Sequence, residues 1–390
     1  MKRVYWALVI LPLLMTACTD DGQSEEMADT VPCVIKYDVT TESAQTRTEV
    51  ITSTNFATDN RQFRIWSLMT NTEKDGATPV PMTSDFNSNP LYDKLVTYTS
   101  DAWIPDATYG IFYWPRSKYR MDCYAIYPSN TTVSFNDTGE KKIVYDSGTQ
   151  FPGNVDLMYA TFSGKRSDGS NETSKTVNLN FHHATAQVMF YGKLSSEYKA
   201  LGWRIEIESI KLYHVNKTGQ FVFSNTVSDL GTVSAMSFTL GNSLPINSFV
   251  YSPQMNIGHL SLTETSVETD DEGKDVPLTE ALMLLPQAVT PWDPSTENTG
   301  TSAPITDGGY LAVKLRAVDG DNNYPLNTSD DGYVTVYSPF GTSSLTDGAW
   351  LAGKAYKYTI TFGASTSVTA EITPWTSAII NPDKPLYPQN

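Results

Sequence analysis

The chain has 390 residues, of which 27 are lysine or arginine and 43 are aspartate or glutamate, so its formal net charge is −16. This acidic balance argues against a nucleic-acid partner, which needs a basic footprint, and against a polybasic grip on a membrane. The length suggests two domains, and 40% of apolar residues is enough to form their cores.

The first 17 residues have the features of an export signal. A basic start at residues 2–3 precedes an apolar run over residues 4–15, which is too short to span a bilayer. Two small residues then lead to Cys18, and this junction resembles the lipobox of bacterial lipoproteins, in which the cysteine is lipidated. We therefore predict a signal peptide over residues 1–17, lipid attachment at Cys18 and an outer-membrane lipoprotein at the cell surface. An ordinary cleaved signal with an incidental cysteine is the alternative.

Residues 18–29 are polar and acidic, and we expect them to form a flexible tether. The acidic residues directly after the cysteine, Asp20 and Asp21, resemble the surface-export signal of Bacteroidetes lipoproteins. A plain solvated tether explains the same composition.

From residue 31 onward the apolar pattern has a period of two, which is typical of half-buried strands. In residues 31–39 the side chains expected on one face are Val31, Cys33, Ile35, Tyr37 and Val39. Similar strands are predicted at 204–215, 310–318, 333–340 and 355–362, and residues 193–201 are a candidate for one short helix. The pattern predicts an all-β protein whose antiparallel sheets pack as β-sandwiches.

A domain boundary is predicted near residue 177. Residues 163–175 are polar, contain glycine and show no apolar period, and a strand-like pattern follows them. We therefore expect an N-terminal sandwich over residues 30–177 and a C-terminal sandwich over residues 178–390.

Few patterns point to chemistry. Residues 348–355 match the start of a phosphate loop, but the following Ser or Thr is absent and a strand pattern follows, so nucleotide binding is not expected. His182 and His183 should point to opposite faces of a strand and cannot hold one metal; we expect His182 to be a buried structural residue. Residues 319–322 are expected to form a hairpin turn rather than a calcium site. We predict no enzyme, no cofactor and no metal site.

Two cysteines remain after Cys18. Cys123 alternates with Met121 and Ala125, a pattern typical of a core strand, and a disulfide between Cys33 and Cys123 is left open.

Several segments, taken in order, resemble the Bacteroidetes fimbrillin family, the Mfa-like subunits of type V pili. No single segment is specific, and the joint pattern carries the resemblance. The segments are "RTEVI" (47–51), "FRIWSL" (63–68), "YWPRSKYRMDCYAIYP" (113–128), "NVDLMYA" (154–160), "NFHHATAQVMF" (180–190), "MLLPQ" (283–287), "WLAGKAYKYTITF" (350–362) and "ITPW" (372–375).

The resemblance implies two transthyretin-like sandwich domains and a specific route of assembly. The precursor would travel as a lipoprotein, an arginine-specific protease would cut behind the first strand, and a strand of the next subunit would fill the opened groove. Arg47 lies eight residues after the predicted strand 31–39, in a small and polar stretch suited to nicking. The implied cut lies between Arg47 and Thr48; a solvated loop arginine is the alternative.

The implied partners are other fimbrial subunits, the outer membrane before processing, and a host or bacterial surface receptor. Three prolines after Trp375 are poor donors to a strand ladder, which favours a tip or accessory role over a stalk. The alternative function is a glycan-binding surface lipoprotein that never polymerises, for which an exposed aromatic platform would be needed.

Overall fold

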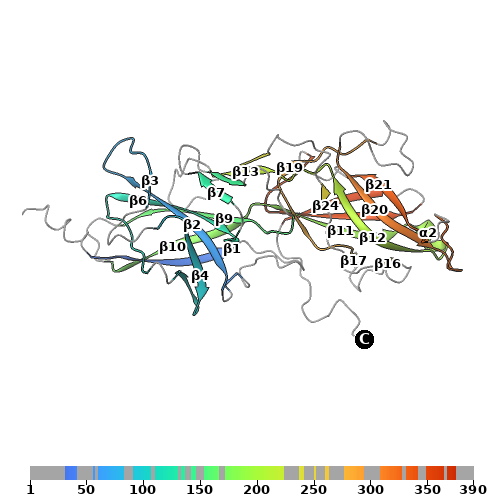
Figure 1. Cartoon of the computed structure of the whole chain (residues 1–390), viewed down its shortest axis with the longest axis horizontal. Helices are drawn as coiled ribbons and strands as arrows, with labels where there is room; N and C mark the ends of the chain where they lie inside the picture. The colour runs from blue at the N-terminus through green and yellow to red at the C-terminus, as the bar shows by residue number, and fades with distance from the viewer. Residues whose placement is uncertain are drawn as a thin grey trace, which may run out of the picture.

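The computed structural model describes residues 31–41, 56–57, 60–82, 91–106, 110–130, 133–136, 142–145, 153–166, 172–223, 237–240, 250–251, 260–262, 276–293, 308–326, 331–340, 348–363 and 367–374. The molecule is elongated, with the strands of the first half at one end and those of the second half at the other (Figure 1). The prediction of an all-β protein is confirmed, and the described residues also contain the short helix expected near residues 193–201, α2 (Ser196–Ala200).

The first half is built on one eight-stranded sheet with the order β3-β2-β4-β5-β1-β10-β9-β6. Its strands are β1 (Val34–Thr41), β2 (Gln62–Asn71), β3 (Val80–Pro81), β4 (Lys94–Thr99), β5 (Ala102–Pro105), β6 (Tyr119–Tyr127), β9 (Met158–Lys165) and β10 (Ser174–His183). The β4–β5 hairpin turns at Ser100 and Asp101, both with positive φ, as a tight two-residue turn requires.

This sheet closes on itself, because β2 also pairs with β6 from Arg64↔Ile126 to Asn71↔Tyr119. In the described part of the chain, β2, β4, β5, β1, β10, β9 and β6 therefore form a barrel-like closed sheet. The prediction of two face-to-face sandwiches is not confirmed, and in the first half one continuous closed sheet encloses the core.

The second half holds two five-stranded sheets around one buried core. One contains β11 (Ala186–Leu194), β17 (Val276–Pro277), β18 (Leu282–Leu284), β23 (Lys354–Phe362) and β24 (Ser367–Pro374). The other contains β12 (Arg204–Tyr213), β15 (Val250–Tyr251), β16 (Leu260–Leu262), β20 (Tyr310–Val318) and β21 (Val334–Pro339). A short pair joins β19 (Gln287–Ala288) to β22 (Ala349–Trp350).

A four-stranded sheet connects the two halves, because it contains strands from both. Its order is β14-β13-β8-β7, with β7 (Val133–Asn136), β8 (Lys142–Tyr145), β13 (Gly219–Val222) and β14 (Ser237–Leu240). Phe135 of β7 stacks on Trp66 with ring centroids 5.1 Å apart, and Phe223, just after β13, meets Tyr124 at 5.1 Å. These rings belong to a buried cluster with residues of both halves, so the halves share a packed interface.

The predicted domain boundary near residue 177 falls within β10. β10 pairs with β1 and β9 of the first sheet, so a boundary between residues 177 and 178 would cut through this strand. The chain passes to the second half at Ala184 and Thr185, between β10 and β11. The polar stretch 163–175 also contributes its ends to β9 and β10. The two-domain division itself stays a prediction.

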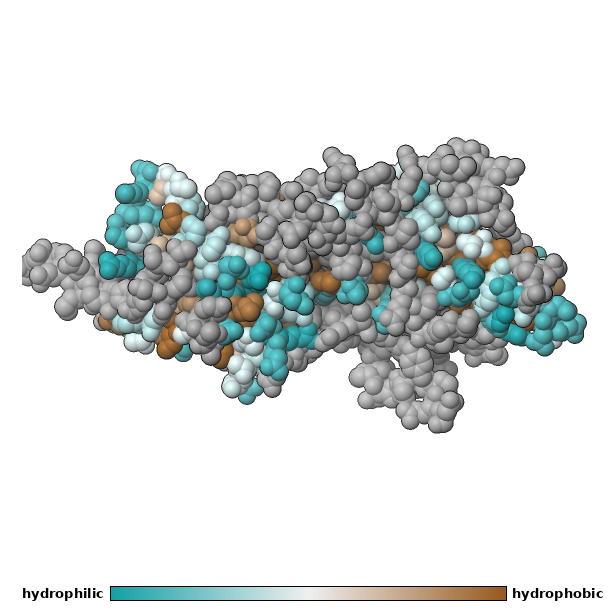
Figure 2. Space-filling model, in the orientation of Figure 1, coloured by the Kyte–Doolittle hydropathy of each residue, from teal (hydrophilic) through white to brown (hydrophobic). Residues whose placement is uncertain are grey.

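On the face in Figure 2, the described surface mixes small hydrophobic patches with hydrophilic residues. The large hydrophobic side chains that are exposed, such as Val80, Ile111 and Leu201, come from different parts of the fold. Within the described residues, no helix is long and apolar enough to cross a membrane.

Candidate functional site: the first strand and its groove

The candidate site is the position of β1 in the closed sheet. On one side β1 runs parallel to β10 in unbroken register, from Val34↔Ser174 to Thr41↔Phe181. On its other side, among the described residues, the pairings are Tyr37↔Trp103 of β5 and the bridge Val34↔Tyr113. β1 therefore lies between two neighbours rather than at an edge of the sheet. We call the space that it fills the β1 groove.

The alternation predicted from the sequence determines which side chains fill this groove. Cys33, Ile35 and Tyr37 are 0%, 5% and 9% exposed, whereas Val31 and Val39 are half-buried. Lys36, Asp38 and Thr40 are exposed on the opposite face. The strand itself begins at Val34 rather than Val31, and it continues to Thr41.

The floor of the groove is made of buried aromatic and aliphatic side chains of the first core. Tyr37 meets Phe63 edge-on at 6.1 Å, and Phe63 in turn contacts Trp103 and Phe181. The Tyr37 hydroxyl is buried without a hydrogen-bond partner, and burial raises its pKa well above the usual value. Side-chain packing therefore holds Tyr37, while its polar atom is left unsatisfied, which costs free energy.

The N-terminal end of β1 is held by several main-chain hydrogen bonds. The amide of Val34 donates to the Thr173 carbonyl at 2.9 Å, and that of Ile35 donates to the Phe112 carbonyl at 2.9 Å. The Trp114 amide donates to the Cys33 carbonyl at 2.8 Å. Because β1 is parallel to β10, and β10 leads into the second half, this end lies away from the second half and Thr41 lies toward it.

Arg166, which sequence analysis missed, adds a buried charge at the same end. It follows β9 directly, is 2% exposed, and donates from Nη1 to the Val31 carbonyl at 3.2 Å. No sequence signal marked this arginine, because the polar stretch around it was interpreted only as the sign of a domain boundary.

The two cysteines of the first half are both buried and free, so the disulfide left open by the sequence is not formed. The Sγ of Cys123 lies 3.2 Å from the Ser67 hydroxyl, and burial raises the Cys123 pKa to about 12. Burial also raises the Cys33 pKa, while the nearby Arg166 and Lys175 act in the opposite direction. Cys123 packs between Met121 and Ala125 in the core as predicted.

The predicted lipid-attachment residue, Cys18, and the predicted cleavage residues, Arg47 and Thr48, lie outside the described residues. Both sites stay predictions. What the structure does describe is β1 between them, ending six residues before Arg47.

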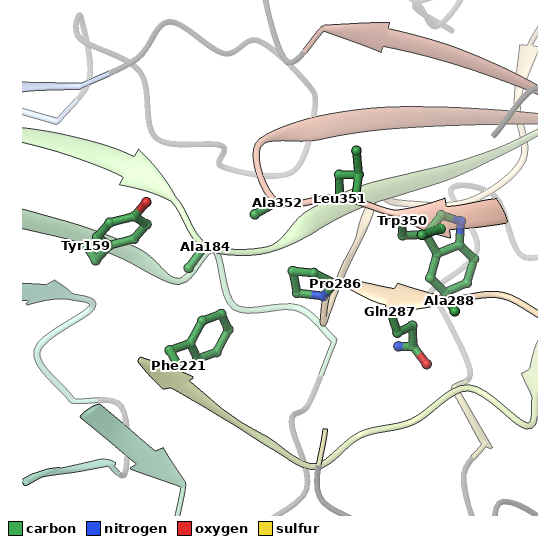
Figure 3. Close-up of a pocket in the computed structure, with 10 residues that line it drawn as sticks. Tyr159, Ala184, Phe221, Pro286, Gln287, Ala288, Trp350, Leu351 and Ala352 are labelled. Atoms are coloured by element: carbon green, nitrogen blue, oxygen red, sulfur yellow. The ribbon is translucent and has the colours of Figure 1, made fainter. Parts of the chain in front are cut away.

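A second feature is a pocket of about 330 Å³ where the two halves meet (Figure 3). Tyr159, Ala184 and Phe221 form one wall, and the segments 286–288 and 349–352 form the other. The amide of Gln287 is already used, because Nε2 donates to the Asn216 and Leu285 carbonyls and Oε1 accepts from the Asn216 amide. The pocket therefore presents mainly apolar walls.

Comparison with known proteins supplies the family. The model of the fimbrillin-like family matches residues 46–375, which is most of the chain. The chain belongs to the fimbrillin-like family. The resemblance inferred from the ordered segments is thereby confirmed, and the matched span begins after β1.

The solved structures similar to this fimbrillin-like chain are distant in sequence. A fimbrial protein from Bacteroides vulgatus is 16% identical, with 88% of this chain and 99% of that chain covered and a TM-score of 0.48. A fimbrilin from Porphyromonas gingivalis is 9% identical, with 89% and 98% covered and a TM-score of 0.39. A comparison with curated proteins finds no match.

Among the described histidines of this fimbrillin-like chain, the buried one is His183 rather than the predicted His182. Its Nδ1 lies 2.9 Å from Oδ1 of Asp156, and both side chains are buried. The prediction failed because the alternation was continued through residues 184–188, whereas β10 ends at His183 and β11 begins at Ala186. On β10 the odd-numbered side chains face inward.

The other patterns of the fimbrillin-like chain have structural roles. Residues 351–353 turn into β23, so the phosphate-loop match does lead into a strand. Asp319 accepts hydrogen bonds from the amides of Asp321 and Asn323, the geometry of a turn. Among the described residues, no group of three or more His, Cys, Asp or Glu side chains is placed to hold a metal ion.

Proposed function

We propose that this chain is a subunit of a fimbrium, or a fimbrillin-like surface adhesin, that assembles by strand exchange in the β1 groove. The observation that carries the proposal is the position of β1: a separate N-terminal segment that completes a closed sheet and fills its core. Removing such a strand takes away only the N-terminal segment and opens a groove between β5 and β10 that another strand could fill.

The energetics of the groove explain why it would not stay empty. Fully burying one apolar side chain contributes roughly 1.5–3 kcal/mol, so Cys33, Ile35 and Tyr37 together contribute on the order of 5–9 kcal/mol. Loss of β1 would also leave β10 with a row of unpaired main-chain groups, which is a template for another strand. A strand from a second subunit would restore both the buried apolar side chains and the main-chain pairing with β10. Such head-to-tail contacts extend into a filament.

The remaining steps of the proposal come from the sequence. Lipidation at Cys18 would hold the precursor at the outer membrane and carry it to the cell surface. Cleavage between Arg47 and Thr48 would then separate β1 covalently from the body and release the body from its anchor. The partners would be other fimbrial subunits, and a tip or accessory role is favoured by the prolines after Trp375.

The alternative of a non-polymerising glycan-binding lipoprotein has less support. None of the aromatic side chains whose burial is described is exposed, so those residues present no aromatic platform for a sugar. Binding to immobilised polysaccharides would favour this alternative if it occurred without any change in size of the protein.

The test is limited digestion of the purified chain with an arginine-specific protease, followed by N-terminal sequencing and size analysis. The proposal predicts one dominant new N-terminus at Thr48 and the appearance of oligomers. A chain with Arg47→Gln is the control and should stay uncut and monomeric. A stable monomer after cleavage at Thr48, or cutting elsewhere in preference to Arg47, would count against the proposal.

A further inference from the structure

Arg166 places a full positive charge at the end of the β1 groove that holds the N-terminal end of β1. Charged side chains are almost never fully buried unless they are paired, and this one is 2% exposed. Nη1 donates to the Val31 carbonyl at 3.2 Å, and Nη2 lies 3.5 Å from the Glu172 carbonyl. Of these two acceptors, one belongs to the β1 segment and the other to the body of the protein.

The exchange proposed above would remove one of these two acceptors. Val31 lies on the segment that leaves, whereas Glu172 and Arg166 stay. A guanidinium cannot lose its proton, so it stays charged after the Val31 carbonyl has gone. A hydrogen bond to a charged group changes affinity by about tenfold to a hundredfold, and a strand that brings no acceptor forgoes this factor.

The surroundings make this end of the groove favourable for an oxygen atom that accepts a hydrogen bond. Lys175 lies over the Trp114 ring at 5.2 Å and donates to the Lys165 carbonyl, so a second cation borders the same end. Both cations act to lower the pKa of the Cys33 thiol, whereas the carboxylate of Glu172 acts to raise it. An uncharged carbonyl or a carboxylate fits next to this pair of cations, whereas an amine does not.

We propose that Arg166 selects the strand that replaces β1, by requiring an oxygen acceptor two residues before the first side chain that enters the groove. This inference rests on the proposed strand exchange. In β1 the acceptor is the Val31 carbonyl, and the first buried side chain is Cys33. The partner is therefore an extended segment of a second subunit with a main-chain carbonyl or a carboxylate at this position, followed by alternating apolar residues.

The experiment uses peptides that differ in this oxygen. The full chain carries the recognition sequence of an unrelated site-specific protease in place of residues 45–49, so that opening the groove does not depend on Arg47. After cleavage, fluorescent peptides compete with β1: acetylated residues 32–41, acetylated residues 33–41, and succinylated residues 32–41. The acetyl group on Pro32 reproduces the Val31 carbonyl, the shorter peptide lacks it without adding charge, and Pro32 itself is exposed. The succinyl group on Pro32 supplies the same carbonyl and adds a carboxylate beyond it.

The unchanged Arg166 chain should bind acetylated 32–41 and succinylated 32–41 about tenfold to a hundredfold more tightly than acetylated 33–41. Arg166→Met should reduce this ratio to less than about threefold, and Arg166→Lys should keep part of it. A merely structural role for Arg166 would weaken all peptides equally and leave the ratio unchanged, which would overturn the inference.

The two proposals fail in different ways. If no peptide enters the cleaved chain, strand exchange in the groove is wrong, and the selection by Arg166 is wrong with it. If the peptides enter with equal affinity in the unchanged chain, exchange is supported and the role of Arg166 is refuted. This second comparison needs no substitution at Arg166, so it stands even if Arg166→Met does not fold.

Discussion

Truncating one buried side chain of β1 should weaken its hold on the groove by a defined amount. Ile35 is 5% exposed and packs in the core of the first half, and replacing such a residue by alanine costs about 2–5 kcal/mol. Lys36 is the matched control. It lies next to Ile35 and also pairs with β10, but its side chain is exposed. Its replacement by alanine should change stability by no more than about 0.5 kcal/mol.

Two assays measure this difference. In the uncut chain, urea unfolding should show the loss for Ile35→Ala as a lower midpoint. After cleavage, the same loss should appear as faster release of the β1 fragment, with a dissociation constant raised at least about 30-fold for the lower limit of 2 kcal/mol. The reasoning would be refuted if Ile35→Ala and Lys36→Ala behaved alike, since burial in the groove would then not hold β1.

Three further predictions concern groups whose environment is described. Cys33 and Cys123 should resist thiol reagents in the intact chain, because both are buried and the Cys123 pKa is raised to about 12. Cys123 should become reactive once β1 has left. Labelling of Cys123 at an equal rate before and after release would contradict this prediction. Tyr37→Phe removes a buried hydroxyl without a partner, so fragment release should be unchanged or slower, and release tenfold faster would show that the hydroxyl is bonded. Burial pushes the Glu206 pKa upward, but hydrogen bonds from Arg316 and Arg204 outweigh it and hold that pKa below its usual value. The stability that this carboxylate contributes is therefore present above its unfolded pKa of about 4.3 and lost as pH falls through the folded pKa, so urea unfolding of Glu206→Gln and the unchanged chain should differ at pH 7 and converge in acid, not diverge.

The strands of this protein could be predicted because the alternation of apolar and polar residues within each segment is enough to identify them. Alternation in residues 310–318 and 204–215 gave strands that match β20 (Tyr310–Val318) and β12 (Arg204–Tyr213) closely, since a half-buried strand needs one apolar and one polar face. The same rule identified which side chains of β1 enter the core. The short helix was a candidate from the sequence, and in the structure Ser195 caps it by accepting from the Tyr198 amide.

Alternation does not specify which strands lie next to each other in a sheet. The closure of the first sheet depends on β2 pairing with both β4 and β6. Their partner residues lie about 30–35 and about 50–60 positions away in the chain, and no local pattern specifies this register. The same limit explains why the role of Arg166 was missed. Its acceptor, Val31, is 135 residues away and is reached only through the fold.

The central claim, that β1 must leave its groove before subunits join, is tested most directly by locking the strand in place. Asp38 and Asn178 are exposed register partners on β1 and β10, and neighbouring strands lie about 4.8 Å apart, within the range for a disulfide. The chain with Asp38→Cys and Asn178→Cys is cleaved behind β1 and its size is followed with and without a reductant. The account predicts a monomer while the disulfide is intact and oligomers after reduction. Oligomers that form equally well with β1 locked in place would contradict it.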